Sequence, residues 1–218
     1  MTLRTPSILL ATAALAFGAA ACGSDDTSST AGTSSPKPVA QVDQLSGQST
    51  AVTLDAGFAD ALKSLKLTPA PVGDASISQA GVASFPITGG NVKYYEPGSV
   101  SPFVQGEIDH EGGGLSLTGG GKKVELTDFV VDPGASVLTG TVSVDGKVAA
   151  QDAPLFFLDG RTLNPLEVNE GNGTAVLEGT TVKLKAEAAQ LLNQTFGVDA
   201  LKAGLVIGVA KITINTAA

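Results

Sequence analysis

The feature that most constrains this chain is a series of short apolar runs, each ended within a few residues by glycine, proline, asparagine or aspartate. The runs cover residues 82–87, 92–95, 103–108, 115–117, 124–131, 137–144, 148–149, 154–158, 174–177 and 181–184. Around Val124 and Leu126 apolar and polar residues alternate strictly, which is typical of strands with one buried face. Turn signals such as Asp145-Gly146 separate the runs. The pattern predicts a mainly β fold, an antiparallel β-sandwich or open barrel.

Two amphipathic helices and a last strand complete the predicted elements. The first helix covers residues 55–66 and rests on the helical spacing of Leu54, Phe58, Leu62 and Leu65. The second covers residues 186–196, and Gly197 is well placed to end it in a left-handed conformation. Residues 205–214 then predict a closing strand, for which both a buried and an edge position remain open because its alternation is partial.

The first 21 residues have the order of a secretory signal peptide. Arg4 precedes an apolar stretch over residues 8–17, and three alanines stand directly before Cys22. A transmembrane helix needs about 20 apolar residues, so this stretch is too short for a permanent anchor.

Cys22 is the only cysteine, and its place after small residues and before Gly23-Ser24 resembles a bacterial lipobox. We therefore expect an exported lipoprotein, held on the extracytoplasmic face of the cell membrane by lipid on Cys22. An ordinary signal peptide followed by a chance cysteine is the alternative.

The mature part divides into a tether and one domain. Residues 22–50 are rich in serine, threonine, alanine, aspartate and proline and lack apolar periodicity, which predicts a flexible tether. Residues 51–218 are expected to form a single β-rich domain. Because the chain has one cysteine, that domain has no intrachain disulfide and depends on burial and backbone hydrogen bonding.

Composition and motifs exclude several classes of function. The formal net charge is −8 and no basic cluster occurs in the mature part, which argues against nucleic acid as a partner. The chain has one histidine and neither a Gly-x-Ser-x-Gly nor a His-Glu-x-x-His motif. We therefore expect a protein that is not an enzyme, although pairs among its 21 acidic residues leave carboxylate chemistry open.

Three residues are candidates for binding a ligand. His110 stands between Asp109 and Glu111 ahead of a glycine run, where it is either a ligand or a solvated residue of a turn. Tyr94 and Tyr95 are the only tyrosines, and adjacent residues of a strand point to opposite faces, so one ring is expected inside. A tyrosine phenolate can ligate ferric haem, while ordinary packing is the alternative.

The order of segments resembles the HtaA-type domain of actinobacterial haem-transport proteins of the cell envelope. The resemblance covers roughly residues 54–214 and rests on the first helix, residues 83–90, residues 103–117 with His110, residues 137–144 and residues 182–208. It implies a predominantly β module that holds haem through a tyrosine near the end of the first helix, supported by a histidine in the middle segment. His110 matches the histidine, whereas Leu65 stands where the tyrosine is expected.

Three functions follow from these observations. The first is a lipid-anchored, non-enzymatic binding or interaction module of the HtaA-like type, with haem as a candidate ligand. The second is a carrier of lipid or another apolar molecule, which needs a large apolar cavity, whereas a haem site needs His110 or a tyrosine facing a flat cleft. The third is a structural or adhesive envelope protein, which would show an exposed apolar patch and no cavity. The expected partners are the membrane and either a small ligand or an envelope protein.

Overall fold

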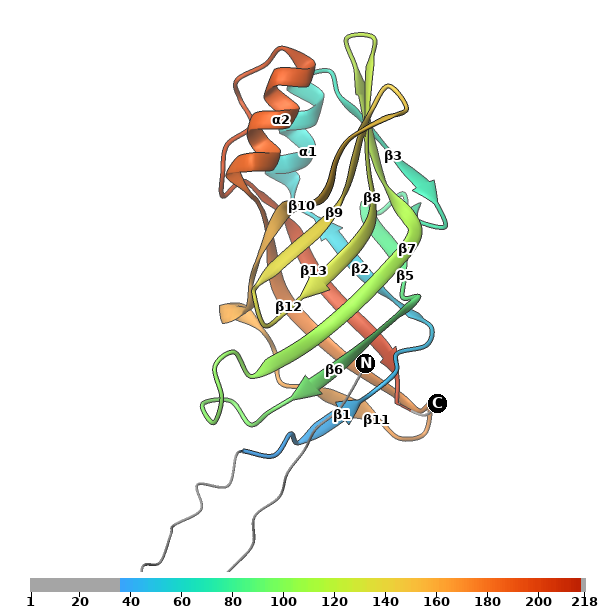
Figure 1. Cartoon of the computed structure of the whole chain (residues 1–218), viewed down its shortest axis with the longest axis vertical. Coiled ribbons are helices and arrows are strands. Elements are labelled where there is room, and N and C mark those ends of the chain that lie inside the picture. Colours follow the sequence, from blue (N-terminus) through green and yellow to red (C-terminus); the bar gives the residue numbers. More distant parts are fainter. Residues whose placement is uncertain (1–35, 217–218) are drawn as a thin grey trace, which may run out of the picture. The chain divides into compact units, whose positions relative to one another are not determined.

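In the computed structural model, which describes residues 36–216, this part of the chain forms one antiparallel sheet of 13 strands (Figure 1). The strands are β1 (Ala40–Val42), β2 (Gln48–Leu54), β3 (Thr68–Gly73), β4 (Ser76–Ile77), β5 (Val82–Pro86), β6 (Gly89–Tyr94), β7 (Val104–Gly119), β8 (Lys122–Asp132), β9 (Val137–Val144), β10 (Lys147–Asp159), β11 (Glu167–Asn169), β12 (Thr174–Leu184) and β13 (Val206–Asn215). Their order is β1-β6-β7-β8-β9-β10-β12-β13-β2-β5-β4, with β11 beside β12 and β3 beside β7. The mainly β prediction is confirmed, and a single curled sheet takes the place of a two-sheet sandwich.

The sheet curls until its two margins meet at one segment of chain. β5 pairs with β2, and after a two-residue connection β6 pairs with β7. In that connection the Ile87 amide donates to the Gln48 carbonyl at 2.8 Å, and the Thr88 amide donates to the Asp109 carbonyl at 2.9 Å. We call this connection the seam. It brings β2 next to β7, so the inner face of the sheet is enclosed.

Two helices lie at the upper end of the sheet in Figure 1, and β1 and β11 lie at the opposite end. α1 (Ala56–Ser64) begins where the Asp55 carboxylate accepts hydrogen bonds from the Gly57 and Phe58 amides. α2 (Ala186–Phe196) ends at Gly197, whose φ of 68° is left-handed as predicted. A short 3-10 helix, η1 (Gly160–Thr162), follows β10. Both predicted helices are therefore present, each within two residues of its expected bounds at either end.

Two sequence-based predictions differ from the structure. The folded part begins before residue 51, because β1 and the start of β2 lie inside the predicted tether and Leu45 is only 2% exposed. Leu45 packs in the core, so this polar stretch contains enough apolar surface to be ordered. His110 lies in the middle of β7 and not in a solvated turn.

The predicted closing strand is β13. It lies between β12 and β2 and is therefore an interior strand, not an edge strand. Within residues 36–216, neither helix has the length and apolar content needed to cross a bilayer. The predicted signal peptide and Cys22 lie outside the described residues.

Candidate functional site

The curled sheet encloses a cavity of about 730 Å³. Its walls come from every strand except β3 and β4 and are mostly apolar, with Val52, Phe85, Ile108, Phe129, Val131, Val182, Ala210 and Ile214 among them. Sites for small molecules typically measure about 300–1,000 Å³ and combine apolar walls with a few polar groups. The cavity therefore has the size and lining of a small-molecule site.

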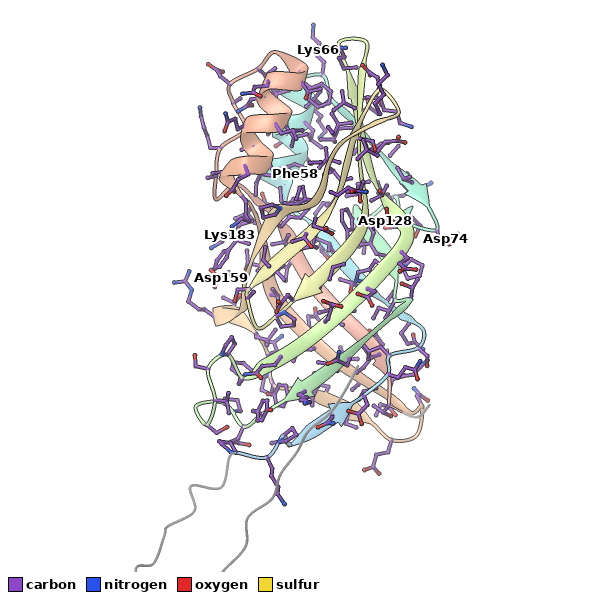
Figure 2. All side chains as sticks on the ribbon, in the orientation of Figure 1. Phe58, Lys66, Asp74, Asp128, Asp159 and Lys183 are labelled. Carbon is purple, nitrogen blue, oxygen red and sulfur yellow. The ribbon has the colours of Figure 1, made fainter. Side chains whose placement is uncertain are left out.

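A glycine run bends β7 beside this cavity. Gly112 has a φ of +73° and its amide donates to the Asp128 carboxylate at 3.1 Å, and Figure 2 labels Asp128 and Asp74 near this bend. A Cβ on Gly114 would lie 2.1 Å from the Leu126 carbonyl oxygen, so only glycine fits where β7 presses against β8. The pairing of β7 with β8 shifts register between His110 and Gly114, as in a β-bulge. The bend thus separates the part of β7 with His110 from the part that pairs with β3.

His110 is a buried polar residue of the cavity wall. It is 2% exposed, its Nδ1 lies 2.8 Å from the Pro86 carbonyl oxygen, and its Nε2 lies 3.2 Å from Thr50 Oγ1. Because a carbonyl oxygen only accepts, Nδ1 carries the proton and donates it to Pro86. Nε2 of the neutral ring then accepts a hydrogen bond from the Thr50 hydroxyl. His110 therefore joins β7 to β5 and to β2 across the seam.

The surroundings of His110 favour its neutral form. Burial lowers its pKa below the ordinary value of 6.5, while the Pro86 carbonyl and the Asp109 carboxylate act in the opposite direction. The Phe85 ring meets the imidazole edge to face, with centroids 6.3 Å apart and planes at 66°. The ring is thus fixed in position and in tautomer.

This arrangement meets one requirement of a haem ligand. A histidine that binds a metal through Nε2 usually donates its Nδ1 proton to a carbonyl or carboxylate, as His110 does to Pro86. Its Nε2 lone pair is engaged only by the Thr50 hydroxyl, which can rotate away. His110 therefore meets this requirement, and it would hold haem iron in place of its hydrogen bond with Thr50.

The two tyrosines lie apart from His110. Tyr94 lines the cavity and packs edge to face on Phe103, with ring centroids 5.7 Å apart, whereas Tyr95 is not among the lining residues. One of the adjacent rings thus lies inward, as their alternation predicts. Tyr94 pairs with Val104, six residues along β7 from His110, which is about 20 Å at about 3.3 Å per residue. Tyr94 and His110 are therefore too far apart to bind opposite faces of one iron.

Leu65, where the resemblance to the HtaA family places a tyrosine, also lies outside this cavity. It forms the C-cap of α1 and packs against the core at the helix end of the sheet. It is absent from the lining residues.

Two parts of the site were missed by sequence reasoning. Thr50 was assigned to the tether, and nothing in its local sequence indicates that it meets a histidine 60 residues away. The second part is an ion cluster at Asp159, which is 5% exposed and also lines the cavity. Its carboxylate accepts hydrogen bonds from Arg161 Nε at 2.8 Å and from Lys183 Nζ at 2.7 Å.

Figure 2 shows Asp159 and Lys183 close together, on the neighbouring strands β10 and β12. The hydrogen bonds from Arg161, and next those from Lys183, hold the pKa of the Asp159 carboxyl far below its usual range. The carboxylate therefore stays charged over the physiological range of pH. Within residues 36–216, no group of three or more histidine, cysteine, aspartate and glutamate side chains is placed to hold a metal ion.

Comparison with known proteins gives matches among solved structures alone. No family model matches the chain. No curated protein matches it at a significant level.

The structural matches include proteins of Corynebacterium glutamicum. The C-terminal domain of HtaA has a TM-score of 0.52 at 15% identity, covering 80% of this chain and 98% of that domain. The N-terminal domain of HtaA has a TM-score of 0.50 at 15% identity, covering 80% and 99%. The haem binding protein HtaB has a TM-score of 0.48 at 10% identity, covering 80% and 95%. The first two matches span nearly the whole of each HtaA domain, and the folded part of this chain has the HtaA-type fold.

Proposed function

We propose that this chain is a non-enzymatic binding module that holds a small, largely apolar molecule inside its curled sheet. The observation that carries the proposal is the apolar cavity of about 730 Å³ with His110 in its wall. Protein interiors are close-packed, and voids much larger than a water molecule are few. An apolar space of this volume, lined by most strands of the sheet, is best explained as the place of a ligand.

Haem is the first ligand to test. His110 lines the cavity, its Nε2 would become available to iron once the Thr50 hydroxyl turns away, and its Nδ1 proton is held by the Pro86 carbonyl, as in metal-binding histidines. Phe85 and Phe129 supply aromatic surface in the same wall. The order of sequence segments, which resembles the HtaA family, adds independent support for haem.

A lipid or another apolar chain is the second candidate, and a separate observation favours it. Among the described residues, no buried side-chain nitrogen or oxygen lacks a hydrogen-bond partner. His110 and Thr50 satisfy each other, so an apolar molecule can fill the cavity without any polar contact. A ligand of this kind would leave the His110–Thr50 pair intact, whereas haem would replace it.

A haemin titration of the full-length protein separates the two candidates. We expect a saturable change in the Soret band that is lost in His110→Ala and kept in Tyr94→Phe and in the matched control Tyr95→Phe. Loss of the Soret change in Tyr94→Phe would instead place the iron beside Tyr94. Each variant is also titrated with a fluorescent fatty-acid analogue, whose binding shows that the cavity is still formed.

No Soret change together with saturable binding of the fatty-acid analogue selects the apolar carrier. Binding of neither probe by the folded wild-type protein would overturn the proposed function.

We also propose that the chain is exported and held on the extracytoplasmic face of the cell membrane through lipid on Cys22. The n-region, the apolar stretch and the lipobox-like residues before Cys22 support this location. Metabolic labelling with palmitate in a bacterial host provides the test, because label should enter the wild-type chain and not Cys22→Ser. Equal labelling of both chains, or of neither, would contradict it.

A further inference from the structure

Some of the exposed apolar side chains of this chain also line the cavity. Among the described residues, five large hydrophobic side chains are exposed, namely Val39, Val148, Phe157, Val168 and Val209. Three of them, Val39, Phe157 and Val168, also line the cavity. Val39 and Val168 are 61% and 53% exposed, so they belong at once to the cavity wall and to the outer surface. We call Val39 and Val168 the rim.

The rim belongs to the end of the sheet where the described chain begins. Val39 directly precedes β1 and Val168 lies in β11, and both strands lie opposite the helices (Figure 1). The β9–β10 hairpin beside Val148 lies at the helix end (Figure 1). Exposed valines therefore occur at both ends of the sheet, but only those at the β1 end also line the cavity.

The chain itself limits how far the rim can lie from a membrane. Cys22 precedes Val39 by 17 residues. A fully extended chain covers at most about 3.6 Å per residue, or about 60 Å here. If Cys22 carries lipid, the rim at Val39 is therefore held within about 60 Å of the bilayer.

We propose that the rim docks on the bilayer to which Cys22 is anchored, so that the cavity opens towards the acyl chains and exchanges its ligand with the membrane directly. The inference rests on the proposed lipid anchor at Cys22 and adds a surface and a partner to it. An apolar ligand would then pass between bilayer and cavity without crossing water, whose contact with apolar surface is unfavourable.

The charges near the rim indicate which kind of bilayer surface suits it. Glu167 and Glu170 flank Val168, Arg161 lines the cavity, and the whole chain carries a formal charge of −8. This mixture offers no basic patch for anionic head groups. The contact is therefore apolar, and phosphatidylcholine vesicles are the appropriate probe, with little dependence on salt.

The absence of tryptophan from the sequence makes a clean test available. Val168→Trp places the only indole on the rim, and Val148→Trp places it on a strand at the other end. The two valines are matched, being 53% and 60% exposed, so both variants should fold. The lipid-modified full chain is reconstituted into phosphatidylcholine vesicles with bromine-labelled acyl chains, which quench indole fluorescence at short range.

We expect quenching of Val168→Trp to be several-fold stronger than quenching of Val148→Trp, and to persist in high salt. Equal quenching of the two variants, with lipid on Cys22 verified by mass, would overturn docking and leave the anchor standing. A chain without lipid on Cys22 would overturn the anchor and, with it, this inference. Ligand binding is measured separately by the haemin and fatty-acid titrations. A failure to bind ligand is therefore distinguishable from a failure to dock on the bilayer or to carry lipid on Cys22.

Discussion

Nε2 of His110 lies 3.2 Å from Oγ1 of Thr50, and this hydrogen bond connects β7 to β2 across the seam of the curled sheet. The other ring nitrogen binds the last carbonyl of β5, at Pro86. One side chain therefore links three strands at the place where the sheet closes. The same side chain is the polar group that we propose for haem, so closure of the sheet and ligand binding depend on a shared residue.

His110→Ala should destabilise the protein by about 2–4 kcal/mol, because it removes the hydrogen-bond partner of the buried Thr50 hydroxyl and of the Pro86 carbonyl and enlarges the cavity. Urea unfolding followed by circular dichroism measures the change, with Tyr95→Phe as the control. A loss under about 0.5 kcal/mol, the range of ordinary surface substitutions, would show that the seam does not need the histidine.

Stability should fall as the pH is lowered from 7 to 5. The pKa of His110 is lowered in the folded state, so below about pH 6.5 the unfolded chain binds more protons than the folded one. The free energy of unfolding that results from the lowered pKa of His110 is fully present above pH 6.5. It is lost as the pH falls towards the lowered pKa, by at most about 1.4 kcal/mol per pH unit.

His110→Gln should remove most of this dependence on pH, since glutamine keeps polar atoms and does not titrate. Urea unfolding of both proteins at a series of pH values is the measurement. Asp159 does not confuse it, because its stabilisation is present above the ordinary carboxyl pKa of 3.8 and is lost only below that value. Parallel curves for the two proteins would contradict the assignment to His110.

Gly114→Ala should destabilise the protein by about 2 kcal/mol or more, because its Cβ would lie 2.1 Å from the Leu126 carbonyl oxygen. Gly160→Ala is the matched control, since a Cβ there meets nothing within 4 Å and its φ is not left-handed. Thermal unfolding of both variants compares them. Similar unfolding midpoints for the two variants would mean that β7 and β8 can move apart at Gly114 without loss of stability.

Ala210→Phe should block the ligand while leaving the fold in place. Ala210 is 5% exposed and lines the cavity from β13, so a phenyl ring would fill part of the space. We expect at least a tenfold loss of affinity, about 1.4 kcal/mol, for whichever probe the wild type binds. An unchanged affinity, with circular dichroism like that of the wild type, would place the ligand elsewhere.

Local features of the fold were predictable from the sequence, because their causes are local. The helix at residues 186–196 ends at Gly197 since glycine accepts the left-handed conformation, and Asp145-Gly146 forms the turn between β9 and β10 as its residue types indicate. Strict alternation likewise identified β8.

The site was less accessible to prediction, because it depends on contacts between distant residues. Thr50 and His110 are 60 residues apart, and only the curl of the sheet brings them together. The sequence leaves open the role of the glycines after His110, which are needed where β7 bends against β8. Alternation along a strand also places the two adjacent tyrosines on opposite faces of the sheet, but it does not tell which face is the inner one.

The seam has an evolutionary consequence. Residues 87–88 belong to both margins of the sheet at once, and each of them donates a backbone hydrogen bond to a different margin. A hairpin such as the one at residues 120–121 projects from the sheet and can accept inserted residues without disturbing its neighbours. An insertion at residues 87–88 would instead move the two margins apart and admit water to the interior. The length of this short connection should therefore vary far less among related proteins than the lengths of their hairpins.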